Sequence, residues 1–131
     1  MVLKMMVYAR TRFVAFHQWE NAPEEYKYLA LPHRHEFHVE AGVKVNLTDR
    51  QEEFHHLKAN LGYTIESLYG KNLQHSGNVG KGATEPLPEP IKASCELIAM
   101  QIGADLRKFN YDVSYVNVSE DGECGGRIEY D

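Results

Sequence analysis

The chain has 131 residues, of which 14 are Lys or Arg and 19 are Asp or Glu, and its formal net charge is −5. This length predicts a single domain over residues 1–131, and the apolar (43%) and charged (25%) fractions are those of a globular protein rather than a disordered chain. The acidic balance argues against a nucleic-acid partner bound through phosphate neutralisation, and no apolar run approaches the roughly 18–20 residues of a membrane span.

The start of the chain and its cysteines predict a cytoplasmic protein. Residues 1–10 lack the long apolar stretch and cleavage site of a signal peptide. Cys95 and Cys124 have no CxxC spacing and are too few for a disulfide framework, which fits a reducing compartment.

Two segments near the N-terminus show the alternation of half-buried strands. In residues 5–17 and again in residues 33–45, apolar residues and histidines recur at every second position. Side chains two apart on a strand share a face, so each segment has one apolar face. A polar connection, residues 18–32, separates the two, and we expect them to pair as an antiparallel hairpin.

Two helices are predicted in the middle of the chain. Thr48, with Gln51 three residues later, has the pattern of a helix start, and Gly62 is a suitable end for that helix. Residues 74–90, rich in Gly and Pro, predict a long surface loop, after which Pro90 can start the second helix. The apolar residues of this second helix are spaced by three or four positions, namely Ile91, Cys95, Ile98, Ile102, Leu106 and Phe109.

The C-terminal segment predicts two more strands, residues 111–120 and 127–130. Asp121–Gly122 and Gly125–Gly126 supply the turn between them. The order is therefore β-β-α-α-β-β, an α+β fold in which two helices cover one face of a four-stranded antiparallel sheet.

The strongest chemical signal is the pair His33 and His35 on the second predicted strand. Both imidazoles lie on one face, with Cα atoms roughly 6.6 Å apart at about 3.3 Å per residue. His17 has the matching parity on the preceding strand and could supply a third ligand. A lone pair of this kind is more often incidental, but three histidines with an open fourth position form the usual catalytic zinc (Zn2+) site. Zinc in such a site polarises a bound hydroxyl or carbonyl, or acidifies water.

The other histidines fit simpler interpretations. His38 has the opposite parity and is expected at the surface. His55 and His56 are adjacent on a helix, so they cannot both face one site. His75 falls in the Gly- and Pro-rich loop, from which it could approach a site, although nothing in the local pattern requires this.

Two carboxylates are candidates for binding a ligand. Glu96 lies near a helix N-terminus, where the helix dipole alone would favour it, and Glu120 ends a strand, where it could simply flank a turn. A buried carboxylate that accepts two parallel N–H bonds would suit the edge of an aminopyrimidinone ring. Cys95 belongs to the apolar stripe and Cys124 to the turn, so neither predicts a reactive thiol.

Five motifs, in order along the chain, resemble the 6-pyruvoyltetrahydropterin synthase and 6-carboxytetrahydropterin synthase family, which has the tunnelling (T-) fold. The family's Phe-x-Ala-x-His motif is similar to residues 13–17, and its His-Gly-His motif is similar to residues 33–35. Its Asp-plus-helix segment is similar to Asp49 with residues 54–58. Its Pro-Thr-Ser-Glu motif is similar to residues 93–96, and its Glu-Thr motif is similar to residues 118–121. Each motif is loose alone, but their conjunction spans nearly the whole chain.

The resemblance implies a specific activity. His17, His33 and His35 would hold zinc, and Glu120, helped by Glu96, would anchor a pterin ring across the cavity from the metal. The substrate would be 7,8-dihydroneopterin triphosphate, whose triphosphate is eliminated in a step of tetrahydropterin or queuosine biosynthesis. The assembly would be a homohexamer, a dimer of trimers, with sites at subunit interfaces.

The chain departs from the family at its acid/base residues. Residues 27–29 are Lys-Tyr-Leu where the family carries its cysteine, and residues 69–70 are Tyr-Gly where it carries an Asp-His pair. Tyr69 and His75 remain as weak candidates for the catalytic role. General acid–base groups commonly contribute roughly 10²–10⁴ in rate, so their loss would slow the usual reaction severely.

Three hypotheses therefore stay open. The first is a zinc-dependent lyase with diverged acid/base residues, and the second is a T-fold protein that binds a pterin- or purine-like ring without the lyase reaction. The third is a cupin, because His33 and His35 followed by Glu40 echo a cupin metal motif. The opposite parity of Glu40 and the two predicted helices count against the cupin.

Overall fold

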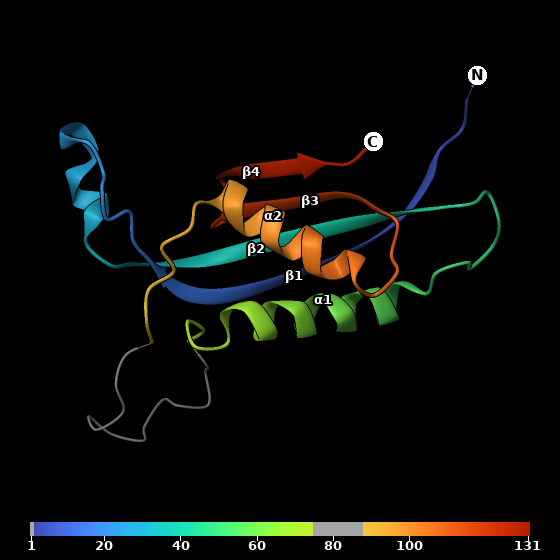
Figure 1. Ribbon diagram of the computed structural model, residues 1–131, viewed down its shortest axis with the longest axis horizontal. Coiled ribbons are helices and arrows are strands. Elements are labelled where there is room, and N and C mark those ends of the chain that lie inside the picture. Colours follow the sequence, from blue (N-terminus) through green and yellow to red (C-terminus); the bar gives the residue numbers. More distant parts are fainter. Residues whose placement is uncertain (1, 75–87) are drawn as a thin grey trace.

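Four strands form one antiparallel sheet in the order in which they occur along the chain (Figure 1). The computed structural model describes residues 2–74 and 88–131. Its elements are β1 (Met5–His17), the 3-10 helix η1 (Glu24–Ala30), β2 (His33–Val45), α1 (Phe54–Tyr69), α2 (Cys95–Arg107), β3 (Val113–Glu120) and β4 (Cys124–Glu129). Both α helices lie on the same face of the sheet, which confirms the predicted α+β fold and its β-β-α-α-β-β order.

The hairpin of β1 and β2 follows the alternation of the sequence. Met5 pairs with Val45 at one end and His17 with His33 at the other, so both strands begin and end where predicted. One face of this hairpin is buried beneath the helices, through Ala9, Phe13, Ala15, Phe37, Val39, Ala41 and Val43. Burying these side chains, at about 25 cal/mol per Å² of apolar surface, is the main force that fixes the register.

The two α helices complete the core. α1 packs on β1, whereas α2 packs on β3 and β4, and the helices contact each other. The buried positions of α2 are Cys95, Ile98, Ala99, Ile102, Gly103 and Leu106, which matches the predicted stripe in the helix itself. Phe109, the last member of that stripe, lies beyond the helix and is 40% exposed.

The predicted bounds of α1 are wrong at both ends. The helix begins at Phe54 rather than after Thr48, because the Glu53 carboxylate accepts hydrogen bonds from the backbone N–H groups of His55 and His56 at 3.1 and 3.0 Å. It continues through Gly62 to Tyr69. One interior glycine costs about 1 kcal/mol, which the buried residues beyond Gly62, including Tyr69, offset.

Pro90 does not start α2. Ile91 instead pairs with the end of β1: its N–H donates to the Phe16 carbonyl at 2.7 Å, and its carbonyl accepts from the Gln18 N–H at 2.9 Å. The helix starts at Cys95, where the Ser94 hydroxyl accepts from the Leu97 N–H at 3.2 Å. This pairing brings the start of α2 beside the end of β1.

The last two strands are joined by a tighter turn than predicted. Asp121 and Gly122 make the turn with positive φ of 55° and 72°, and β4 begins at once at Cys124. Gly125 and Gly126 therefore lie in β4, not in the turn. A Cβ atom on Gly126 would lie 2.9 Å from the backbone nitrogen of Glu96, so this glycine allows β4 to approach α2 closely.

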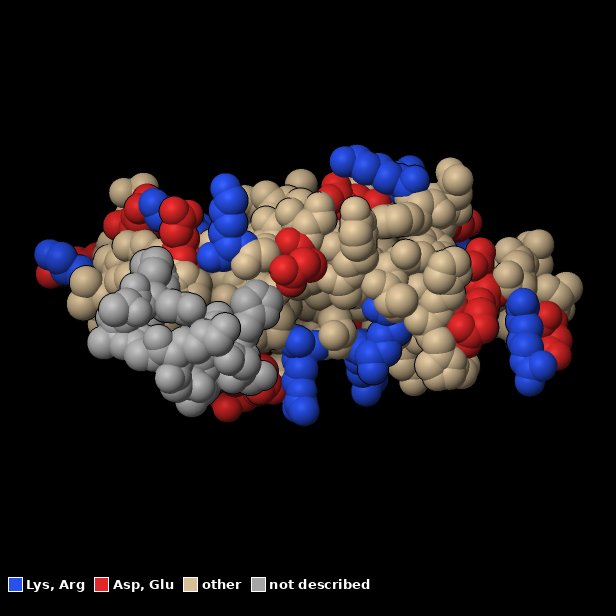
Figure 2. Space-filling model, turned by 90° about the horizontal axis from the view of Figure 1, so that it is seen from below, with Lys and Arg blue, Asp and Glu red and all other residues tan. Residues whose placement is uncertain are grey.

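The remaining features concern the surface and the predicted loop. Residues 75–87, most of that loop, lie outside the described residues. On the face that Figure 2 shows, basic and acidic side chains of the described residues lie interspersed among uncharged ones. No helix in residues 2–74 and 88–131 is long and apolar enough to cross a membrane.

Candidate metal centre

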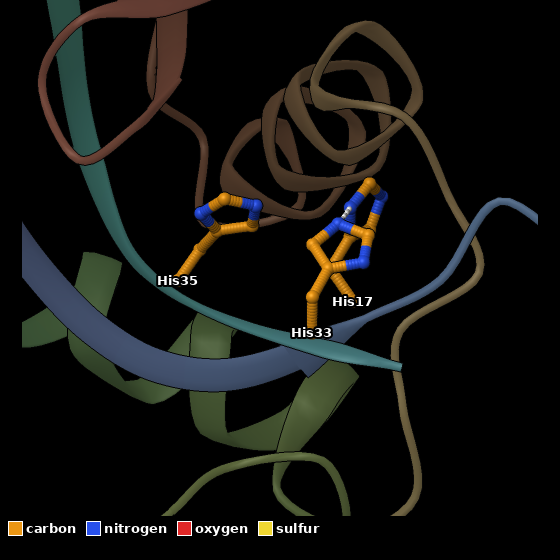
Figure 3. A group of neighbouring side chains, drawn as sticks. All are labelled: His17, His33 and His35. Carbon is orange, nitrogen blue, oxygen red and sulfur yellow. Dashed lines mark hydrogen bonds between the residues drawn. The ribbon is translucent and has the colours of Figure 1, made fainter. Parts of the chain in front are cut away.

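The sheet register brings three histidines together at one end of the core face. His17 pairs with His33, and His35 pairs with Ala15 one step further along the sheet. Directly paired residues share a face, so all three imidazoles project to the same side of the sheet, toward α2 (Figure 3). One nitrogen from each ring lies within 4.8 Å of the others.

The second nitrogen of each ring is held by a hydrogen-bond acceptor. Two of these acceptors are backbone carbonyls and the third is a carboxylate. The pairs are His17 Nε2 with the Ala93 carbonyl at 2.9 Å, His33 Nδ1 with the Leu31 carbonyl at 2.9 Å, and His35 Nδ1 with Asp121 Oδ2 at 2.8 Å. A carbonyl or carboxylate oxygen can only accept, so the ring proton sits at each of these nitrogens.

In the neutral form of each imidazole the remaining nitrogen carries a lone pair, and these three nitrogens face one another. His17 Nδ1 lies 3.3 Å from His33 Nε2, the contact marked in Figure 3. Burial lowers the pKa of His17, which favours its neutral form. Lone pairs at this separation repel unless a cation lies among them. Neutral imidazoles whose other nitrogen donates to a protein oxygen are the arrangement in which proteins hold zinc, so the residues present fit that ion.

Glu120 lies beside these nitrogens. It ends β3 directly opposite the buried Phe37 of β2, and therefore shares the face of the histidines. Its Oε1 atom is 3.3 Å from His17 Nδ1, and its Oε2 atom is 3.4 Å from His35 Nε2. The carboxylate is thus next to the imidazoles rather than separated from them by the width of a cavity.

A cavity of about 490 Å3 adjoins the histidines. His17 and His33 line it on one side, and Glu96, from the first turn of α2, lines it together with Glu120. Its size is within the range of sites that take small organic ligands. The structure therefore brings two of the three predicted metal ligands, His17 and His33, and both predicted carboxylates to one cavity.

Sequence reasoning missed several residues of this site. Cys124 pairs with Glu120 across β3 and β4 and lines the cavity, as does Trp19 from the β1–β2 connection. The sequence pattern predicts Asp121 as a turn residue. Its position directly after Glu120 was the available signal, because neighbours at a strand end can reach the same site. Cys95 also lines the cavity, and burial, with the nearby Glu120 and Glu96 carboxylates, raises its pKa to about 12.

Tyr69, one of the two weak catalytic candidates, lies in the core. Its ring stacks on Phe13, and its hydroxyl donates a hydrogen bond to Gln101. It lines a second cavity, shared with Asp105, and burial raises its pKa to about 12. A phenol with this pKa is a poor base at neutral pH. His75, the other candidate, lies outside the described residues.

The other histidines lie apart from this cluster. His38 is on the opposite face of β2, where its Nε2 atom is 2.9 Å from Glu36. His55 is exposed at the start of α1 beside Glu53. Glu40, the third residue of the cupin-like pattern, pairs with Arg10 at 2.6 Å on that same opposite face. The cupin hypothesis therefore loses its carboxylate ligand.

No protein-family model matches this chain, and no curated protein matches it in sequence. Solved structures match its fold. An uncharacterized protein from Wolinella succinogenes aligns with a TM-score of 0.67 at 15% identity, over 99% of this chain and 100% of that one. The 6-pyruvoyl tetrahydropterin synthase of Caenorhabditis elegans aligns with a TM-score of 0.59 at 10% identity, over 98% of this chain and 97% of that one. The chain thus has the fold of 6-pyruvoyl tetrahydropterin synthase, which confirms the predicted T-fold.

Proposed function

We propose that this protein is a zinc-dependent lyase of the 6-pyruvoyl/6-carboxytetrahydropterin synthase type. It acts on 7,8-dihydroneopterin triphosphate or a related pterin and eliminates triphosphate. The observation that carries the proposal is the cluster of His17, His33 and His35, whose facing nitrogens lie within 4.8 Å of one another beside a cavity of ligand size. The shared fold supports it, because the Caenorhabditis elegans enzyme with this fold is a 6-pyruvoyl tetrahydropterin synthase.

The residues of the cavity have distinct roles in this proposal. The three histidines hold Zn2+, which when bound would supply a Lewis acid for the side-chain hydroxyls of the substrate. Glu96 and Glu120 are acidic groups that can accept N–H bonds from the edge of a pterin ring. Trp19 gives the same cavity an aromatic wall for a flat ring.

General acid–base catalysis is not assigned to a residue. Tyr69 lines another cavity, and its pKa of about 12 does not suit a base at neutral pH. The family's cysteine and Asp-His pair have no counterpart in the sequence. We therefore expect turnover slower than that of an enzyme with these groups, by roughly 10²–10⁴.

The assembly and location follow the same proposal. We expect a homohexamer built as a dimer of trimers, acting in the cytoplasm of the cell. β1 and β4 are the two outer strands of the sheet, and pairing of such edges between copies is a common way to remove unpaired backbone groups.

Metal analysis is the first test. Purified protein loaded with zinc and desalted should retain about one zinc per chain, as a three-histidine site predicts. The double variant His33→Ala/His35→Ala should retain none. His38→Ala is the matched control, because His38 lies on the same strand but on the opposite face and should leave the zinc content unchanged. Wild-type protein without zinc would overturn the proposal.

Turnover is the second test. Protein is incubated with 7,8-dihydroneopterin triphosphate, and released triphosphate and the pterin product are measured by mass spectrometry. We expect release with wild-type protein and with His38→Ala, and none with His35→Ala. Tight binding of the pterin without any release of triphosphate would contradict the lyase and leave only a ring-binding protein.

A further inference from the structure

We infer that Gln18 is a positioning residue of the metal centre, because its side-chain amide fixes the backbone segment whose carbonyl orients the His33 ring. This role rests on the proposed zinc site and goes beyond it, since neither the sequence pattern nor the resemblance to the pterin enzymes gives Gln18 a function. Gln18 directly follows His17 at the end of β1. Its effect passes through Ala30 and Leu31, at the far end of the β1–β2 connection.

Three consecutive carbonyls tie the end of the β1–β2 connection back to the histidine end of the hairpin. Each has a different kind of partner: a backbone N–H, a side-chain amide and a histidine ring. The pairs are the Leu29 carbonyl with the Trp19 backbone N–H at 2.9 Å, the Ala30 carbonyl with the Gln18 side-chain amide at 3.0 Å, and the Leu31 carbonyl with His33 Nδ1 at 2.9 Å. The bond from Gln18 therefore lies between a backbone bond and the bond that holds the ring.

The end of η1 explains why a side-chain donor is needed there. η1 ends at Ala30, and the last carbonyls of a helix have no partner within it. Leu31 is extended, with φ of −87° and ψ of 146°, as expected before Pro32, which itself has no backbone N–H to donate. The Gln18 amide supplies the donor from the neighbouring strand end.

Gln18 is itself anchored. Its backbone N–H donates to the Ile91 carbonyl at 2.9 Å, and its half-buried side chain lines the same cavity as His17 and His33. Without the side-chain donor, the segment that ends in Leu31 loses one of its three ties, and its carbonyl holds the His33 ring less firmly. The partners of metal-binding histidines fix the orientation of the ring, and their loss lowers metal affinity.

Zinc affinity, measured by competition with a chromophoric chelator, is the first readout. Gln18→Met keeps the length of the side chain and removes the donor, so we expect zinc binding about three- to tenfold weaker than in wild-type protein. This is less than the roughly 10–100-fold cost of losing the direct partner of a ligand, because Gln18 acts one bond further away. About one zinc per chain should still bind at saturation.

Gln101→Met is the matched control. It also removes one half-buried hydrogen bond, the bond from the Tyr69 hydroxyl, but in the other cavity, so zinc affinity should stay as in wild-type protein. Circular dichroism and melting of the metal-free variants check that both are folded. Gln18→Leu, which also lacks a donor, replaces Gln18→Met if that variant folds poorly.

Cobalt substitution supplies a spectroscopic readout. The visible absorption of Co2+ reports the geometry of its ligands. Gln18→Met should broaden or shift the spectrum of the cobalt-loaded protein, because the His33 ring is held in a less defined orientation. Gln101→Met should leave the spectrum as in wild-type protein.

Hydrogen exchange in the metal-free proteins tests the route from Gln18 to the ring. Measured by mass spectrometry, residues 28–34 should exchange faster in Gln18→Met than in Gln101→Met, because one of the three bonds that close the connection is gone. Equal exchange in the two variants would overturn the inference, as would zinc affinity and a cobalt spectrum unchanged in folded Gln18→Met, while the three-histidine site stands. Absence of zinc binding in wild-type protein would instead overturn both the proposed function and the role of Gln18.

Discussion

Asp121 holds two groups of the site at once. Its Oδ2 atom accepts from His35 Nδ1 at 2.8 Å, and its Oδ1 atom accepts from the Glu36 backbone N–H at 2.9 Å. The backbone bond from Glu36 and then the bond from His35 lower the pKa of Asp121. It is therefore ionised at neutral pH, and as an acceptor it fixes the orientation of the His35 ring.

Asp121→Asn tests this orienting role. Asparagine also tolerates the positive φ of 55° at this position, so the turn should survive. The neutral amide is a weaker acceptor for His35 and leaves its ring less firmly oriented. We expect zinc affinity to fall about 10–100-fold, with about one zinc per chain still bound at saturation. The measurement is chelator competition, with exposed Asp112→Asn as the matched control. Equal affinities in the two variants would contradict the orienting role.

The two cysteines of the cavity should react differently. Burial, reinforced by Glu120 and Glu96, raises the pKa of Cys95 to about 12, so its thiol is protonated at pH 8, whereas Cys124 is exposed. Iodoacetamide at pH 8 should modify Cys124 in the native protein and Cys95 only after unfolding, as read by peptide mass spectrometry. Cys124→Ser should remove the native labelling. Rapid native labelling of Cys95 would show that the first turn of α2 opens.

At this scale the sequence predicts the cluster of three histidines better than the partners of their rings. Parity alone places His17, His33 and His35 on one face, because strand geometry is local and regular. The partners Ala93 and Asp121 lie far along the chain from the rings that they hold. Their contacts depend on a tight turn and on how strands align, which no local pattern encodes.

Two glycines differ in whether the packing of their element requires them. Gly62 lies within α1, and a Cβ atom there would meet no atom within 4 Å. Gly126 lies in β4, where a Cβ atom would lie 2.8 to 3.0 Å from atoms of Glu96 in α2. The first glycine costs helix stability without a packing reason, and the second is required by the close contact of strand and helix.

Substitution by alanine should therefore move stability in opposite directions. Gly62→Ala should stabilise the protein by about 0.5–1 kcal/mol, because alanine loses less backbone entropy in a helix. Gly126→Ala should destabilise it by about 1–3 kcal/mol, because β4 and α2 must separate. Urea unfolding of the metal-free proteins measures both, and the exposed Ser67→Ala in α1 controls for a helix change without a glycine. A destabilising effect of Gly62→Ala would contradict this prediction, because another group would then have to occupy the space beside Gly62 in solution.

The elements were predictable where their pattern is local. β1 and β2 match their predicted bounds because thirteen alternating residues in each leave one register that buries the apolar face. α2 starts five residues late because Ile91 pairs with β1, a long-range contact that outweighs the helix preference after Pro90. The predicted end of α1 at Gly62 is wrong because the burial of residues beyond it, such as Tyr69, outweighs the tendency of glycine to end a helix.

In the part of the chain that the structure describes, the sheet has one covered face and one open face. Helices cover the first, whereas Met6 and Tyr8 of β1 are 45% and 54% exposed on the second. β1 is also an outer strand, and among the described residues only its C-terminal end has a further partner, in Leu73 and Ile91. Exposed apolar side chains beside a free strand edge are typical of surfaces that pair with another chain.

The proposed hexamer predicts that this surface is buried between copies. Light scattering after size-exclusion chromatography should give wild-type protein a mass near six times that of the 15.0 kDa chain. Met6→Lys/Tyr8→Lys should lower that mass, because placing cations at a subunit contact costs desolvation and repulsion between copies. Tyr63→Lys is the matched control: Tyr63 is 66% exposed on α1, and its replacement should leave the mass unchanged. A single-chain mass for wild-type protein, or equal masses for the double variant and wild type, would contradict burial of this face in a hexamer.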